Sequence, residues 1–211
     1  MINKYSKEEH IVLNIPNKLT IIRVCLSPVF LIFLLWSSLP HHYLYANLIF
    51  IIASITDAID GKFARKHNLI TDFGKFLDPL ADKILVACAL VGMVELHILS
   101  SWYCVIILAR EFMVTSIRLV AAGKGNVIAA NFWGKLKTVT QLIAIIAILT
   151  FEEGLFILNE YFSALAAPYM NIINTSVLWL NNILMAIATL ATVISGIKYV
   201  SENIQYIKSG K

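Results

Sequence analysis

Long apolar runs separated by short polar stretches dominate the chain. Residues 2–14 can form a short interfacial helix, and residues 158–174 are expected to form a loop or re-entrant element. Six runs are long enough to cross a bilayer as helices, at about residues 19–38, 43–64, 79–99, 101–121, 134–157 and 175–200. The pattern predicts an all-α integral membrane protein with six transmembrane helices in one bundle.

The composition favours lipid rather than water around most side chains. Of the 211 residues, 59% are hydrophobic and 14% are charged, whereas soluble domains carry roughly 25% charged residues. No Pro/Gly/Ser-rich linker divides the chain, so we predict a single domain over residues 1–211. Cys25, Cys88 and Cys104 stand singly in apolar segments, which is typical of small buried residues rather than of disulfides or metal ligands.

Lys and Arg are distributed unevenly between the two ends of the predicted spans. With six alternating spans, the two termini, the 65–78 turn and the 122–133 loop share one side, and basic residues flank all of them. The other three connections contain no Lys or Arg, so the positive-inside rule places both termini in the cytoplasm. The net charge of +4 therefore indicates topology and not nucleic-acid binding. The absence of a cleavage pattern or transit peptide favours a retained N-terminus and a bacterial plasma membrane.

Four aspartates lie where the second span ends and the third begins. Only 14 apolar or small residues precede Asp57 in its span, about 21 Å of helix against a hydrocarbon core about 30 Å thick. These acids therefore lie at or within the inner membrane boundary. Asp57 and Asp60 are spaced i,i+3, and Asp78 and Asp82 are spaced i,i+4, so each pair shares one helix face. If a short turn near Leu69 joins the two helices, the four carboxylates converge.

Four carboxylates in a partly desolvated volume require protonation or cations. Ligands that are all oxygen favour hard ions, so we predict two divalent cations, Mg²⁺ or Mn²⁺, at this site. The alternative is ion pairing at the lipid interface with neighbouring basic residues, namely Lys62, Arg65, Lys66 and Lys75. Such pairs would not require the acids to share helix faces.

Written as a pattern, the segment from Asp57 to Asp82 reads D-x2-D-G-x2-A-R-x8-G-x3-D-x3-D. It resembles the signature of the CDP-alcohol phosphatidyltransferases at all eight fixed positions. Six spans with cytoplasmic acids also match the architecture of that family. The resemblance implies an enzyme that transfers a phosphatidyl group from CDP-diacylglycerol to an alcohol and releases CMP, and it suggests a homodimer.

The resemblance also assigns roles to residues. The four aspartates would bind the metals, and Asp82 would in addition act as general base. Asn17, Thr20 and Arg23 match the N-x2-T-x2-R pattern that precedes the first span in this family. Contacts to the donor CDP-diacylglycerol are implied for five residues, namely Asn17, Thr20, Gly61, Arg65 and Thr71.

A second charged set, in the fourth and fifth spans, comprises Arg110, Arg118, Lys135 and Lys137. Arg110 is about eight residues from either end of its span, where an unpaired guanidinium would cost several kcal/mol, so it should face a polar cavity. Arg118 follows eight residues later, about 80° around the helix, and can face the same cavity. We predict an anion pocket for a phosphorylated acceptor. The alternative is that Glu111 pairs with Arg110 while the lysines extend to the interface.

The segments AREF and GKLKT around these basic residues resemble family members that use sn-glycerol 3-phosphate. The implied product is phosphatidylglycerophosphate, and inositol phosphate is the nearest alternative acceptor. An ion or proton transporter is the alternative from another class, because intramembrane carboxylates also form ion pathways. A transporter would spread its acids along the membrane normal, whereas these lie at one level. A purely structural membrane scaffold would tolerate replacement of the acids.

Overall fold

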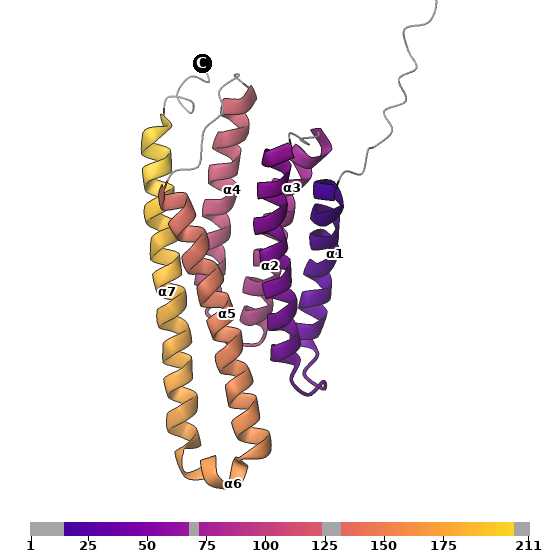
Figure 1. The fold of residues 1–211 in the computed structure, drawn as a ribbon. Coiled ribbons are helices and arrows are strands. Elements are labelled where there is room, and N and C mark those ends of the chain that lie inside the picture. Colours follow the sequence, from indigo (N-terminus) through magenta and orange to yellow (C-terminus); the bar gives the residue numbers. More distant parts are fainter. Residues whose placement is uncertain (1–14, 68–71, 124–131, 205–211) are drawn as a thin grey trace, which may run out of the picture.

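The regular secondary structure of the described residues is entirely helical (Figure 1). The computed structural model describes the backbone of residues 15–67, 72–123 and 132–204, and their side chains except those of 15–19, 57–67, 72–80 and 82. Six long helices are present, namely α1 (Ile15–Leu35), α2 (His42–His67), α3 (Asp72–Glu95), α4 (Ser101–Gly123), α5 (Phe132–Tyr161) and α7 (Met170–Glu202). The short helix α6 (Ser163–Ala166) and the 3-10 turn η1 (Ala167–Tyr169) connect α5 to α7.

The six long helices coincide with the six apolar runs, so the all-helical prediction is confirmed. The predicted 158–174 connection is shorter, because α5 continues to Tyr161 and α7 begins at Met170. Backbone hydrogen bonding continues through polar residues that a hydropathy pattern excludes from a span. The first helix ends earlier than predicted, at Leu35, before a Ser- and Pro-containing turn. The predicted interfacial helix at 2–14 lies outside the described residues.

The long helices pack side by side in a closed order. Helix α1 contacts α2 and α3, α2 contacts α5, α5 contacts α7, and α4 joins α7 to α3. One hydrophobic cluster contains side chains from all six helices, including the fully buried Phe30, Phe50, Leu90, Ile148 and Met185. The rings of Phe30 and Phe50 lie 5.6 Å apart between centroids. The core therefore runs through the middle of the bundle.

Small residues let α1 approach α3 closely. A Cβ atom at Gly92 would lie 2.6 Å from Leu34 Cδ2 and 2.9 Å from Leu31 Cδ1. Ala89, one turn earlier on the same face, is fully buried. Close backbone packing over glycine and alanine is a common means of helix association in lipid, where burial of apolar surface gives little driving force.

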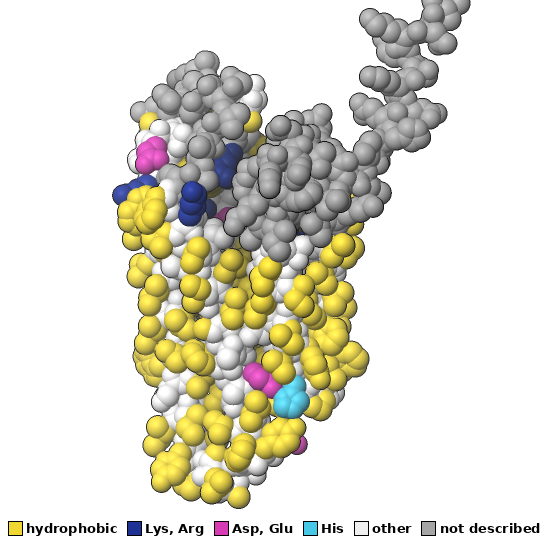
Figure 2. Space-filling model, viewed as in Figure 1, with side chains coloured by type: hydrophobic (Ala, Val, Ile, Leu, Met, Phe, Trp, Pro, Cys, Tyr) yellow, Lys and Arg dark blue, Asp and Glu magenta, His cyan; other side chains and the backbone are white. Residues whose placement is uncertain are grey.

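Large apolar side chains cover much of the outside of the bundle. Ile32 is 58% exposed and Leu119 is 68% exposed, and Figure 2 shows hydrophobic side chains over most of the face below the Lys and Arg side chains. Among the described residues, the segments Phe132–Tyr161 and Ser163–Glu202 are long and apolar enough to cross a membrane by length and composition. Soluble monomers rarely expose apolar surface on this scale.

A polar cluster ties the α1–α2 connection to α5 at the end remote from the Lys and Arg side chains in Figure 2. Glu153 is buried within α5, and its Oε1 atom lies 2.5 Å from His41 Nδ1. The backbone N–H of Leu44 donates to Glu153 Oε2 at 3.2 Å, and His41 Nε2 lies 3.1 Å from the Tyr161 hydroxyl. His41 adopts a left-handed conformation with φ of 59°, and these contacts hold it there.

Candidate active site

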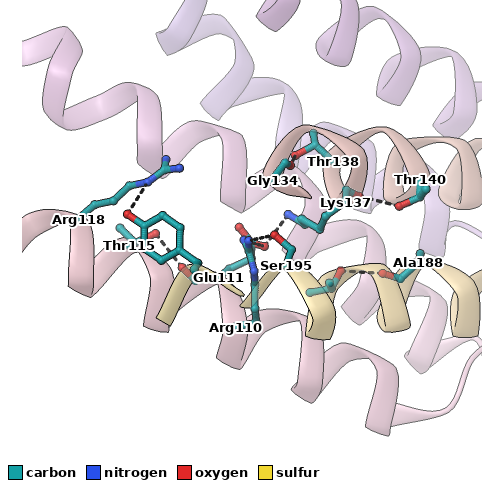
Figure 3. Close-up of polar contacts among 12 residues, drawn as sticks. Arg110, Glu111, Thr115, Arg118, Gly134, Lys137, Thr138, Thr140, Ala188 and Ser195 are labelled. Carbon is teal, nitrogen blue, oxygen red and sulfur yellow. Dashed lines mark hydrogen bonds and ion pairs between the residues drawn. The ribbon is translucent and has the colours of Figure 1, made fainter. Parts of the chain in front are cut away.

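Helices α4, α5 and α7 bring four polar side chains into contact inside the bundle (Figure 3). Arg110 Nη1 lies 3.1 Å from Glu111 Oε1, and Lys137 Nζ lies 2.5 Å from the same oxygen. Arg110 Nη2 also donates to Ser195 Oγ at 2.6 Å. One carboxylate on α4 thus links an arginine of its own helix to a lysine of α5, and a serine of α7 fixes the far side of the guanidinium.

A second contact between α4 and α7 lies about two helical turns beyond Arg110, toward the C-terminal end of α4. Arg118 Nε donates to the Tyr199 hydroxyl at 3.3 Å, and its guanidinium carbon lies 5.5 Å from the centre of the Tyr199 ring. Tyr199 is buried against Val114 and Ile117, whereas Arg118 is exposed. Helix α7 therefore orients both arginines of the predicted anion pocket.

Among the described side chains, the cluster contains more positive than negative charge. The side chains of Arg110, Glu111 and Lys137 are 10%, 13% and 8% exposed, so all three are largely removed from solvent. Buried cations require compensation, and Glu111 neutralises only one of the two. The predicted alternative was that Glu111 pairs with Arg110 while the lysines extend to the interface. The first part is observed, but Lys137 does not extend to the interface, because it binds the same carboxylate. The remaining positive charge makes the cluster suitable for an anionic ligand.

A small cavity of about 30 Å³ adjoins the cluster between α3, α4 and α5. Its polar lining comes from Lys83, Glu111, Lys137, Thr138 and Gln141. Lys83 directly follows the last aspartate of the predicted metal site on α3. The basic cluster therefore lies against the part of α3 that carries the acidic motif.

Gly196 on α7 leaves room for the stem of Arg110. A Cβ atom at Gly196 would lie 2.9 Å from Arg110 Cγ. Next to this contact a groove of about 540 Å³ runs between α4 and α7, lined almost entirely by apolar groups such as Met113, Val193 and Ile197. A side chain at position 196 would displace the arginine, because the Cγ atom cannot move without moving the guanidinium.

Comparison with known proteins agrees with the motif. The sequence model of the CDP-alcohol phosphatidyltransferase family matches residues 13–194. The chain belongs to this family. It is 42% identical to a CDP-diacylglycerol–glycerol-3-phosphate 3-phosphatidyltransferase of Bacillus subtilis, over 93% of this chain and 98% of that protein.

Two further relatives of this phosphatidyltransferase have related names. A probable phosphatidylglycerophosphate synthase of Mycobacterium tuberculosis is 39% identical over 92% of this chain and 83% of that protein. A CDP-diacylglycerol–glycerol-3-phosphate 3-phosphatidyltransferase of Rickettsia prowazekii is 36% identical over 88% of this chain and 93% of that protein. The family predicted from the motif is therefore confirmed.

Of the other predicted site residues of this phosphatidyltransferase, the structure describes the side chains of some and not of others. Thr20 is buried on α1, and Lys135 is exposed on α5. Lys135 precedes Lys137 by two residues, which turns it to a different face of the helix. Thr71 lies outside the described residues. Seven residues belong to α1, α2 or α3, but their side chains lie outside the described part, namely Asn17, Asp57, Asp60, Gly61, Arg65, Asp78 and Asp82.

Sequence reasoning missed four polar residues around the cluster of this phosphatidyltransferase, namely Lys83, Gln141, Ser195 and Tyr199. Two sequence signals were available for them. Gln141 follows Lys137 at i+4, and Thr192, Ser195 and Tyr199 follow a helical spacing in the C-terminal half of α7. Such polar stripes indicate a buried polar face, although they do not identify the helix that it contacts.

Proposed function

We propose that this phosphatidyltransferase transfers the phosphatidyl group of CDP-diacylglycerol to sn-glycerol 3-phosphate, giving phosphatidylglycerophosphate and CMP. The observation that carries the proposal is the position of the basic cluster against α3, directly after the acidic motif. Lys83, next to Asp82 in α3, lines the same cavity as Glu111 and Lys137. A phosphorylated acceptor held by Arg110 and Lys137 would therefore have its hydroxyl near the carboxylates.

The bundle is proposed to cross the plasma membrane six times as one domain over residues 1–211. Helix α1, with 21 residues, is about 32 Å long and helix α7, with 33 residues, is about 50 Å long, which suffices for a hydrocarbon core of about 30 Å. The exposed apolar side chains of Figure 2 would then face lipid. The uneven distribution of Lys and Arg supports a cytoplasmic active site. The family resemblance supports a homodimer.

We propose that Asp57 and Asp60 of α2 and Asp78 and Asp82 of α3 hold two divalent cations, Mg²⁺ or Mn²⁺. The donor set fits, because carboxylate oxygens are the ligands that these ions prefer. When bound, the cations would supply positive charge that offsets the diphosphate of the donor and the negative charge of the departing CMP.

The protein groups account for the remaining steps of the proposed reaction. Asp82 would accept the proton of the attacking acceptor hydroxyl, whose oxygen forms the new bond to the phosphatidyl phosphorus while the bond to CMP breaks. The acceptor phosphate would bind to Arg110, Lys137 and Arg118, and the exposed Lys135 would add positive charge. The donor head group would be held by Asn17, Thr20, Gly61, Arg65 and Thr71.

An acceptor comparison tests this function. Purified protein supplied with Mg²⁺ or Mn²⁺ and CDP-diacylglycerol should release CMP and form phosphatidylglycerophosphate with sn-glycerol 3-phosphate. Inositol phosphate and serine, offered separately at equal concentration, should support much slower release. The proposal fails if sn-glycerol 3-phosphate gives no turnover or if inositol phosphate is the better acceptor. Ion flux in vesicles without nucleotide chemistry would favour the transporter instead.

Gly196→Ala should weaken acceptor binding. The added methyl group would displace the stem of Arg110, and overpacking of this kind typically costs about 1–3 kcal/mol, so the KM for sn-glycerol 3-phosphate should rise about tenfold. The KM for CDP-diacylglycerol should not change. Gly154→Ala is the matched control, because a Cβ atom there has no neighbour within 4 Å. Equal effects of the two variants on acceptor KM would contradict the assigned role of Gly196.

A further inference from the structure

The cavity beside the basic cluster is lined by an amide nitrogen without a partner among the described side chains. Gln141 is 1% exposed, and its Nε2 atom makes no hydrogen bond to any described residue. Leaving a buried amide donor without an acceptor is unfavourable, so such groups normally serve a ligand or an ordered water. Gln141 lines the cavity together with Glu111 and Lys137.

The size and chemistry of the cavity restrict what Gln141 can bind. A cavity of about 30 Å³ is large enough for a small polar group such as a hydroxyl or a water molecule. A hydroxyl fits, because it can accept a hydrogen bond from the Gln141 amide and donate one to a carboxylate oxygen.

The position of Gln141 relative to the proposed phosphate site indicates which hydroxyl would enter. Lys137 and Gln141 lie on one face of α5, four residues or about 6 Å apart along the helix axis. In sn-glycerol 3-phosphate the secondary hydroxyl is on the carbon next to the phosphate ester, and the primary hydroxyl is one carbon further away. With the phosphate at Lys137, the secondary hydroxyl would reach Gln141, and the primary hydroxyl would remain free to react.

We propose that Gln141 is a specificity-determining residue that donates a hydrogen bond to the non-reacting secondary hydroxyl of the acceptor. This inference rests on the proposed function. According to this proposal, the cavity distinguishes a phosphorylated polyol from a phosphorylated alcohol that has no second hydroxyl. A site that holds a substrate hydroxyl discriminates strongly against an analogue that lacks it, because its own polar groups are then left unpaired.

The test compares two acceptors, sn-glycerol 3-phosphate and 3-hydroxypropyl phosphate, which lacks the secondary hydroxyl. In the wild type, kcat/KM should favour sn-glycerol 3-phosphate by about a hundredfold. In Gln141→Leu and Gln141→Met, which keep a similar volume without the amide, this preference should largely disappear. The loss should come from slower turnover of sn-glycerol 3-phosphate alone.

Thr140→Val is the matched control. Thr140 lies on the same helix but does not line the cavity, and its hydroxyl already donates to the Leu136 carbonyl at 3.0 Å, so the preference should remain as in the wild type. An unchanged preference in both Gln141 variants, or an equal loss with both acceptors, would overturn the proposal and leave only a water or packing role. Failure of the wild type to use sn-glycerol 3-phosphate at all would instead refute the proposed function.

Discussion

Asp82→Asn should lower the rate of CMP release by about a thousandfold, within the range attributed to a positioned general base. The substitution keeps the size of the side chain but removes the negative charge and the basic oxygen. Both proposed roles, metal binding and proton acceptance, would be lost together. The rate should be measured with saturating CDP-diacylglycerol, sn-glycerol 3-phosphate and divalent cation, so that weakened binding does not imitate the loss of chemistry.

Glu95→Gln is the matched control for this prediction. Glu95 is an exposed acid at the opposite end of the same helix, α3, and its replacement should leave CMP release unchanged. Protein yield and thermal unfolding of both variants in detergent show whether the bundle is intact. Near wild-type turnover by Asp82→Asn would remove the general base from the proposed mechanism.

Much of the fold was predictable because the apolar runs are long and clearly separated. A run of about twenty apolar residues has no stable alternative to a helix in lipid, since every backbone polar group must be paired internally. The helix ends were less predictable, as α5 shows by continuing to Tyr161. Helical hydrogen bonds extend into polar residues, and hydropathy does not report them.

The candidate site was predictable as chemistry and less so as geometry. The spacing from Asp57 to Asp82 indicated the family without any tertiary information. The depth of Arg110 indicated that it needed a polar partner. Two contacts depend on how α4, α5 and α7 pack. Glu111 contacts both Arg110 and Lys137, and Ser195 completes the contacts of the guanidinium. Helical periodicity assigns a residue to a face, and only packing determines what that face contacts.

Arg110→Ala should raise the KM for sn-glycerol 3-phosphate by about a hundredfold or more. Truncating one partner of a buried charge contact costs about 2–5 kcal/mol, part of which comes from the groups left unpaired. Here the loss would leave Ser195 without its guanidinium partner and Glu111 with Lys137 alone, which cancels the excess positive charge of the cluster. The KM for CDP-diacylglycerol should change little, because the donor is assigned to residues on α1, on α2 and in the α2–α3 connection.

Arg110→Lys distinguishes charge from geometry at this position. A lysine keeps the positive charge, but its single ammonium group lacks the planar fork that contacts Glu111 through Nη1 and Ser195 through Nη2. The acceptor KM should therefore be intermediate between those of the wild type and Arg110→Ala.

Lys198→Ala is the control for both variants. It removes a cation of α7 that stacks over Trp133 instead, and it should leave the acceptor KM unchanged. If Arg110→Ala lowered kcat while the acceptor KM stayed constant, the arginine would have to act on the transition state, and the cluster would no longer explain recognition of the acceptor phosphate.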